Sequence, residues 1–143
     1  MSDRTATGYS GKALWAKLGL RAGLRTLVCG APGDYAVLTG FDTDRLQWVV
    51  KTAGIDFGHA FVRSRAELDA ILDELVPHLE PAGQLWVSWP KRSSGVATDL
   101  TEDGVRAAAL PRGLVDVKVC AVDAVWSGLK LVWRRERRPP RKT

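Results

Sequence analysis

The sequence predicts an α/β fold, with a mostly parallel sheet of about six strands, helices on both faces and an antiparallel hairpin at the C-terminal end. Three observations predict this class. Apolar strand-like segments alternate with helical ones, several of these strands are apolar at every position, and the last two follow each other without a helix between them. Strands that are apolar throughout are typical of parallel sheets, because helices cover both of their faces.

The N-terminal part of the chain predicts two short helices and two strands. Ser10 is placed to cap a helix over residues 11–18, which Gly19 ends. Residues 26–29 form a short apolar segment bounded by glycines, which predicts a buried strand, and residues 30–33 predict a tight turn. A second helix is expected over residues 34–39 and a second strand over residues 46–51.

The middle of the chain contains the clearest helix signal. After a third predicted strand at residues 55–62, Ser64 and Glu67 have the spacing of a capping box. The apolar side chains that follow recur with helical spacing, at Leu68, Ile71, Leu72, Leu75 and Val76. Residues 81–83 then predict a turn, and residues 84–89 a fourth strand.

The C-terminal part predicts a loop, a helix and a hairpin. Residues 90–98 are polar, and Asp99 with Glu102 has the spacing of a second capping box, opening a helix that extends to about residue 110. Two strands follow at residues 114–122 and 129–133, joined through residues 123–128. The domain prediction is therefore one α/β domain over residues 1–133, with a loose N-terminus over residues 1–9.

The charge of the chain is concentrated at its C-terminal end. The sequence has 21 Lys and Arg against 16 Asp and Glu, a formal charge of +5. The last ten residues hold six of the basic residues and one acidic residue, so residues 1–133 are electrically neutral. Residues 134–143 are predicted to be a basic, disordered tail. Such a tail can hold a polyanion weakly, and the binding should fall steeply with salt.

Several classes of protein do not match this composition. No apolar segment approaches the roughly 20 residues of a membrane helix, and the N-terminus lacks an apolar signal segment, which predicts a cytoplasmic protein without membrane contact. The two cysteines, Cys29 and Cys120, are expected to be small buried side chains. The two histidines, His59 and His78, have no ligand-type residue at metal-binding spacing, so no metal site is expected.

Several sequence phrases resemble a family of short bacterial proteins of unknown function. They are Tyr-Ser-Gly at 9–11, Ser-Trp-Pro-Lys at 88–91, Ser-Gly-Val-Ala-Thr-Asp-Leu at 94–100 and residues 117–123. In addition, residues 57–89 are similar to the second half of class I S-adenosylmethionine-dependent methyltransferases, with Leu-Glu-Pro-Ala-Gly at 79–83 in place of that family's turn. The resemblance implies a methyltransferase-like fold and brings no established activity with it.

The residues expected to hold the cofactor depart from the methyltransferase pattern. The loop after the first strand has two glycines, with the rigid Pro32 between them, and Lys51 falls where an acidic residue would hold the ribose hydroxyls. An ammonium group cannot accept a hydrogen bond from a hydroxyl. No cofactor is therefore expected, and S-adenosylmethionine is kept as an alternative.

Two groups of residues are candidates for ligand binding. The loop after the fourth strand offers Lys91, Arg92, Ser94, Thr98 and Asp99, which together suit a small anion at the edge where α/β sheets bind ligands. The alternative is that Asp99 only caps a helix. The last hairpin offers Asp123, Trp126 and Ser127, which either line a pocket or partner surface or serve their own turn.

These observations favour a methyltransferase-like domain that has no methyl-transfer activity. We expect this domain to bind a small anionic ligand or a protein partner. No catalytic residues are identified. One alternative is a small enzyme working at loop 90–99 with Lys91, Thr98, Asp99 and Asp123; another is a protein that binds polyanions through its tail. His59 is expected to be a hydrogen-bonded core residue, and the tryptophans on predicted strands, at 48, 86, 89 and 133, are expected in the core.

Overall fold

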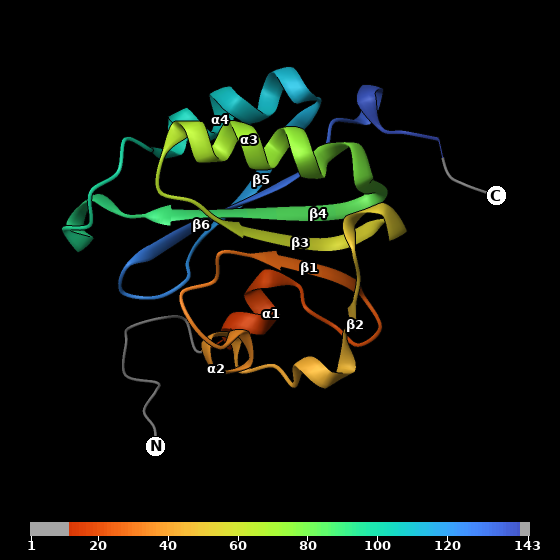
Figure 1. Ribbon diagram of the computed structural model, residues 1–143, viewed down its shortest axis with the longest axis horizontal. Helices are drawn as coiled ribbons and strands as arrows, with labels where there is room; N and C mark the ends of the chain where they lie inside the picture. Colours follow the sequence, from red (N-terminus) through yellow and green to blue (C-terminus); the bar gives the residue numbers. More distant parts are fainter. Residues whose placement is uncertain (1–11, 141–143) are drawn as a thin grey trace.

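The computed structural model describes residues 12–140, which form one sheet covered by helices (Figure 1). The strands are β1 (Arg25–Cys29), β2 (Gln47–Trp48), β3 (Ile55–Phe61), β4 (Leu79–Pro90), β5 (Leu114–Ala121) and β6 (Trp126–Trp133). The α-helices are α1 (Leu14–Leu18), α2 (Tyr35–Thr39), α3 (Arg65–Leu75) and α4 (Glu102–Ala109). The predicted cap of the first helix, Ser10, lies outside the described residues.

The sheet has the predicted mixed topology. Its strands lie in the order β2-β1-β3-β4-β6-β5. The first four of these pair in parallel, and β6 pairs antiparallel with both β4 and β5. The prediction of a mostly parallel α/β sheet closed by an antiparallel hairpin is confirmed.

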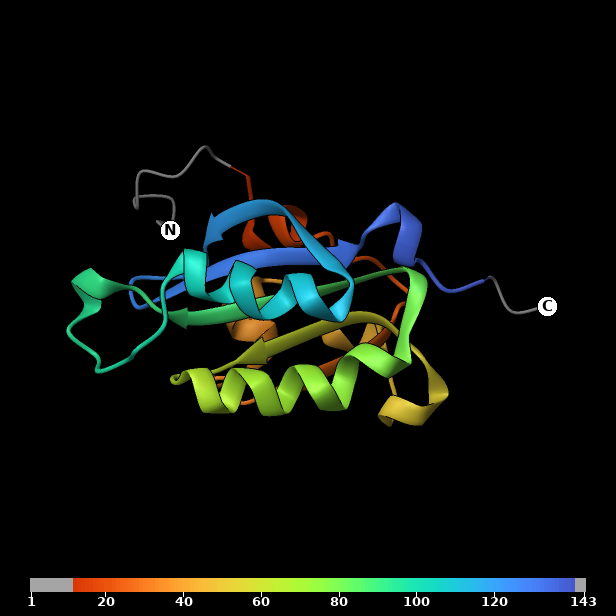
Figure 2. The same cartoon turned by 90° about the horizontal axis from the view of Figure 1, so that it is seen from above.

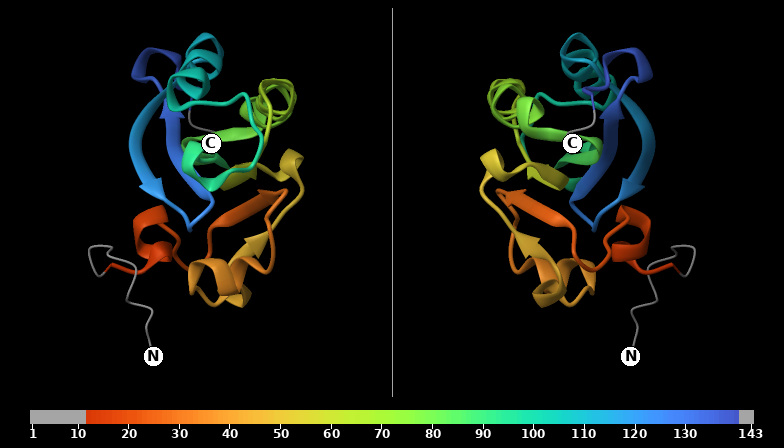
Figure 3. Two further views of the ribbon diagram at one scale, coloured as in Figure 1. Left: turned by 90° about the vertical axis from the view of Figure 1, so that its left-hand side faces the viewer. Right: turned by 90° about the vertical axis from the view of Figure 1, so that its right-hand side faces the viewer.

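Each face of the sheet has its own core. Helices α3 and α4 cover one face, and α1 and α2 cover the other (Figure 3). Because side chains alternate along a strand, Phe57, His59 and Phe61 of β3 lie on the α1–α2 side. Leu85 and Val87 of β4 pack on the α3–α4 side.

The helix ends follow the sequence signals in three of the predicted places, one of which is the end of α1 at Gly19, whose φ is 85°. The Ser64 hydroxyl accepts a hydrogen bond from the Glu67 N–H, and the Glu67 carboxylate accepts one from the Arg63 N–H, so the capping box of α3 is confirmed. Helix α2 is capped by Asp34 and ends at Gly40, whose φ of 77° is in the left-handed region.

The chain between β3 and β4 differs from the prediction. Residues 81–83, predicted as a turn, lie within β4, and the pairing of β4 with β3 is irregular between Ile55–Leu79 and Phe57–Gln84. A Cβ atom on Gly83 would lie 2.7 Å from the carbonyl oxygen of Ile55. The glycine is therefore needed for close approach of the two strands rather than for reversal of the chain.

The second predicted strand is also much shorter than expected. Pairing with β1 covers Gln47 and Trp48, and the 3-10 turn η3 (Lys51–Ala53) then leads into β3. At this edge of the sheet the Trp48 side chain is 51% exposed, so its predicted place in the core is wrong. Trp86 and Trp89 are buried as predicted.

The first residues of the predicted basic tail follow directly on β6. Beyond β6 the chain forms a further 3-10 turn, η7 (Arg135–Arg137), and the Arg134 N–H donates to the carbonyl of Gly113 at 2.9 Å. Residues 141–143 lie outside the described part. Within residues 12–140, none of the helices has the length and apolar character to cross a membrane.

Candidate ligand-binding edge of the sheet

The strands β1, β3 and β4 end at the same edge of the sheet, because they are parallel. The segments that follow them, residues 30–34, 62–64 and 91–101, lie on the left in Figure 1, together with the turn between β5 and β6. Open α/β sheets bind ligands outside the carboxyl ends of their strands. This edge is therefore where a functional site is expected.

The loop between β4 and α4 encloses a hollow of about 400 Å³. The loop projects beyond the end of β4 (Figure 2). Of the predicted ligand residues, Arg92, Thr98 and Asp99 line the hollow, and Lys91 and Ser94 lie in the same loop without lining it. The Lys91 N–H donates to the carbonyl of Val125 at 2.8 Å, so this loop and the last hairpin are tied together.

The polar side chains at the end of this loop bind backbone groups. Thr98 donates through its hydroxyl to the carbonyl of Arg63 at 2.6 Å and accepts from the N–H of Leu100. Asp99 accepts from the N–H of Arg65, the first residue of α3. The cap of α4 is Thr101, whose hydroxyl accepts from the Gly104 N–H. The predicted capping box opened by Asp99 is therefore wrong, since Asp99 caps the neighbouring helix.

Of the three predicted hairpin residues, Asp123 serves the turn, whereas Trp126 and Ser127, predicted in the turn, are the first two residues of β6. Asp123 accepts hydrogen bonds from the N–H groups of Val125 and Trp126, both at 2.8 Å. The Trp126 ring is 4% exposed and meets the ring of Phe61 edge-on, and the Arg63 guanidinium lies over its face. Ser127 is half-buried, opposite Trp89 on β4. These three predicted site residues do not line the hollow.

A buried chain of hydrogen bonds lies beneath this edge. His59 is fully buried on β3, with its Nδ1 2.6 Å from the Tyr35 hydroxyl and its Nε2 2.7 Å from the Ser88 hydroxyl. Burial lowers the pKa of His59 to about 3 and raises the pKa of Tyr35. The imidazole is thus neutral, and the predicted structural role of His59 is confirmed.

Sequence reasoning missed Tyr35 and Ser88 as partners of His59. The signal was present in part, because Gln84, Trp86 and Ser88 alternate along one strand and so share a face. Nothing in the sequence indicates that α2 brings Tyr35 to the same histidine.

The loop after β1 is held by contacts within the protein. Gly30 has a φ of 73°, and a Cβ atom there would lie 2.8 Å from the carbonyl oxygen of Phe61, so the protein's own backbone makes the close approach. At the start of α2, the Asp34 carboxylate accepts from the N–H groups of Ala36 and Val37. These are donors that an anionic group of a ligand would need.

The predicted place of the ribose-binding position is wrong. Lys51 begins η3, which leads into the amino end of β3, and its ammonium is 2.8 Å from the Glu74 carboxylate. It therefore lies away from the carboxyl edge, and its charge does not bear on a ribose there. Strand β2 pairs with β1 only through Gln47 and Trp48, so it ends before Lys51 is reached.

The described part of the chain also lacks a group of side chains suited to binding a metal ion. Residues 12–140 contain no cluster of three or more His, Cys, Asp or Glu side chains that could hold a metal ion. Cys29 and Cys120 are both free and half-buried, and burial raises the pKa of each thiol.

Solved structures similar to this chain include methyltransferases and a protein of the NADB-Rossmann superfamily. Magnesium protoporphyrin IX methyltransferase from Synechocystis PCC 6803 with bound SAH aligns over 84% of this chain and 78% of its own, at 10% identity and a TM-score of 0.55. A protein in the NADB-Rossmann superfamily from Streptococcus agalactiae aligns over 90% and 71%, at 12% identity and a TM-score of 0.52.

A third structure, Aeropyrum pernix fibrillarin with natively bound S-adenosyl-L-methionine, aligns over 78% of this chain and 67% of its own, at 15% identity and a TM-score of 0.51. The chain spans 38% of ribosomal protein L11 methylase from Lactobacillus delbrueckii subsp. bulgaricus. It spans 40% of the magnesium protoporphyrin IX methyltransferase with bound SAM. Neither a protein-family model nor a curated protein sequence matches it. The chain therefore has a Rossmann-like, methyltransferase-like fold.

Proposed function

We propose that this methyltransferase-like domain binds a small anion, a phosphate or a carboxylate, in the hollow of loop 91–101 and carries no adenosyl cofactor. The observation that carries the proposal is the hollow itself, which lies at the edge where such folds bind ligands and has Arg92 among its lining residues. Its volume of about 400 Å³ is near the lower end of the roughly 300–1,000 Å³ of small-molecule pockets.

The charges at this edge support an anionic ligand. Four carboxylates there, those of Asp34, Glu67, Asp99 and Asp123, accept hydrogen bonds from backbone N–H groups. The ion pairs within residues 12–140 do not use Lys91 or Arg92. The Arg92 side chain, which lines the hollow, is therefore available to a ligand, and Lys91 adds a second positive charge in the same loop.

The runner-up is an enzyme that depends on S-adenosylmethionine. Its support is the fold, which is shared with structures that hold SAM or SAH at TM-scores above 0.5. Against it stand the contact of Gly30 with the Phe61 backbone and the hydrogen bonds by which Asp34 engages the backbone N–H groups at the start of α2. A protein partner that presents a carboxylate or phosphate would meet the same cations as a free anion.

Titration calorimetry on the full chain tests the proposal. Inorganic phosphate and succinate are titrated separately at low salt, so that the two anion chemistries are distinguished. We expect one of them to bind, and Arg92→Ala to weaken it by about tenfold or more, because a charged hydrogen-bonding partner is lost. Arg135→Ala is the matched control, since Arg135 is exposed at the far end of the chain.

Two results would contradict the proposal. If neither anion binds, or if Arg92→Ala binds as tightly as the wild type, the hollow is not an anion site. If S-adenosylmethionine or its demethylated product binds with micromolar affinity in the same calorimeter, the cofactor part is wrong and the enzyme alternative is favoured.

A further inference from the structure

Two lysines lie opposite each other on the α1 side of the sheet. Lys130 of β6 is paired with Trp86 of β4 on one side and with Lys118 of β5 on the other. Residues directly opposite on antiparallel strands share a face, and Trp86 belongs to the core on the α1–α2 side. Both lysines therefore lie on that side, in an arrangement of like charges that is destabilising by itself.

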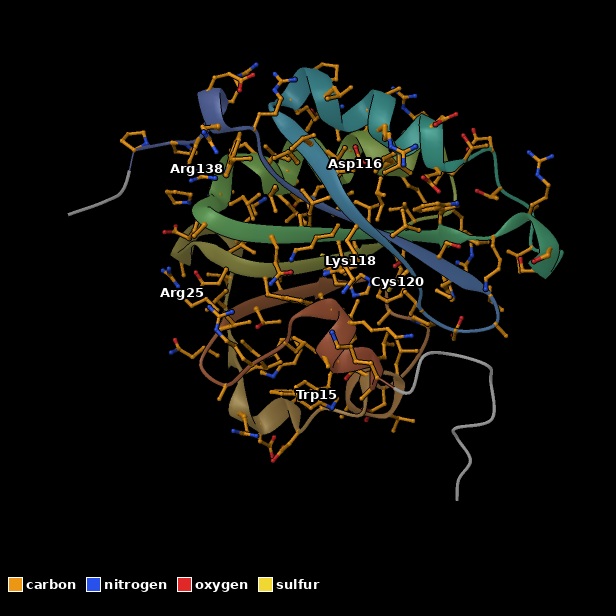
Figure 4. All side chains as sticks on the ribbon, turned by 180° about the vertical axis from the view of Figure 1, so that it is seen from behind. Trp15, Arg25, Asp116, Lys118, Cys120 and Arg138 are labelled. Carbon is orange, nitrogen blue, oxygen red and sulfur yellow. The ribbon has the colours of Figure 1, made fainter. Side chains whose placement is uncertain are left out.

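Lys118 is held at the end of helix α1. Its ammonium donates to the carbonyl of Lys17 at 2.8 Å, and the Trp86 indole N–H donates to the next carbonyl, that of Leu18, at 2.9 Å. Figure 4 shows Lys118 on β5 beside Cys120, with α1 next to them. The bond to Lys17 uses one of the three ammonium protons, so Lys118 keeps two donors for a further partner.

Lys130, by contrast, is half-buried and its ammonium has no partner among residues 12–140. Neither a hydrogen bond nor an ion pair of these residues involves it. Burial and then the charge of Lys118 lower the pKa of Lys130. The other titratable groups of this cluster are Lys17 and the Cys120 thiol, whose pKa is raised by burial. Neither of them is a carboxylate that would keep the Lys130 ammonium charged.

An amine in this environment is a nucleophile. A lysine that is partly removed from water and lies next to another cation loses its proton more readily, and the free amine attacks carbonyl carbons. The exposed Lys118 supplies a positive charge for an anionic group of the same electrophile. The two lysines together therefore suit a small molecule with a carbonyl group next to a carboxylate.

We propose that Lys130 is a covalent modification site for small 2-oxo acids, whose carboxylate is held by Lys118. The lone pair of the Lys130 Nζ forms a bond to the carbonyl carbon. The carbonyl oxygen leaves as water with the two hydrogens of the neutral amine, so the product is an imine and nothing is oxidised or reduced. The site is separate from loop 91–101, because it lies on the α1 side of β5 and β6.

Reductive trapping of the imine tests this proposal. The full chain is incubated at pH 7 with pyruvate and cyanoborohydride, which reduces the imine to a stable secondary amine, and the labelled lysines are identified by peptide mass spectrometry. Lys130 is labelled about tenfold or more faster than Lys12, which is exposed, and Lys51, which pairs with Glu74.

Variants of the neighbouring lysine show whether the pair acts together. Lys118→Gln slows labelling of Lys130 about fivefold or more and moves its half-maximal pH upward, because removing the positive charge raises the pKa of the amine. Lys118→Arg keeps the charge and labels within about twofold of the wild type. Lys51→Gln is the matched control at a distant lysine and leaves Lys130 labelling unchanged.

Acetone tests the role of the carboxylate, because it has the carbonyl group alone. With acetone, the preference for Lys130 over Lys12 falls about threefold or more below that with pyruvate, since the ion pair with Lys118 is lost. The proposal is overturned if pyruvate labels these lysines at similar rates, if Lys118→Gln labels as the wild type, or if acetone keeps the full preference. If Lys118→Gln does not fold, the acetone comparison decides.

Discussion

The buried histidine makes the stability of this protein depend on pH in a defined range. His59 is fully buried between Tyr35 and Ser88, and its pKa is lowered to about 3 by burial. In the unfolded chain the imidazole has an ordinary pKa of about 6.5. Between about pH 3 and pH 6.5, the imidazole is therefore protonated in the unfolded state but not in the folded state. The stability that is present above pH 6.5 is lost as the pH falls from there toward 3.

The expected loss follows from linkage. Below pH 6.5 each pH unit costs about 1.4 kcal/mol, so the free energy of unfolding falls by about 2 kcal/mol between pH 7 and pH 5. With a urea dependence of about 2 kcal/mol per molar, the midpoint of urea unfolding moves down by about 1 M. Asp56, whose pKa is lowered, adds a loss in the same direction only below its ordinary range near pH 4.

Urea unfolding at pH 7, 6 and 5, followed by tryptophan fluorescence, measures this loss. His59→Gln keeps hydrogen-bonding groups but cannot be protonated, so its stability should be nearly constant over this range. His78→Gln, at a half-buried position outside the core, is the matched control and should follow the wild type. If the wild type and His59→Gln lose stability equally, or if the wild type does not respond, the assignment of a neutral, buried imidazole is refuted.

Three further predictions concern the same side of the sheet. Gly30→Ala should lower the free energy of unfolding by about 1–3 kcal/mol, because its φ is positive and the Cβ atom meets the Phe61 carbonyl. In the same denaturant unfolding experiment, the control Gly33→Ala, whose Cβ lies in open space, should change it by less than about 1 kcal/mol. Ser88→Ala should cost about 1–3 kcal/mol, since His59 loses a hydrogen-bond partner; a neutral result in thermal unfolding would contradict this. Burial raises the pKa of Tyr35, so its phenol should not ionise while the protein is folded. The alkaline titrations of tyrosine absorbance should therefore coincide for the wild type and Tyr35→Phe until the protein unfolds. An extra titration step in the wild type would show that the phenol is accessible.

The local signals in the sequence were most successful where hydrogen bonds are local. The capping box at Ser64 and Glu67 and the helix ends at Gly19 and Gly40 each depend on residues within four positions of one another. Asp99 shows that a local spacing can be misleading when the hydrogen bond is made to a distant part of the chain. Its spacing from Glu102 resembles a cap for α4, yet its carboxylate binds the N–H of Arg65, which is 34 residues away.

The candidate site, like the helix caps, was predicted from the sequence only in part. The loop after β4 was predicted as a ligand-binding segment, and the structure shows a hollow there, lined by Arg92, Thr98 and Asp99. Lys51 was misplaced, because a strand's length depends on its neighbours and β2 pairs over only two residues.

The order of apolar, amphipathic and turn-forming residues was enough to specify an α/β fold with parallel strands and a final hairpin, because hydrophobic periodicity and helix caps act over a few residues. Which side chains meet was decided only by the tertiary structure. The contacts of His59 with Tyr35 and Ser88 span 24 and 29 residues, and they exist because α2 packs against β3 and β3 pairs with β4. Hydrogen bonds of this kind depend on distances in space, which spacing along the chain does not encode.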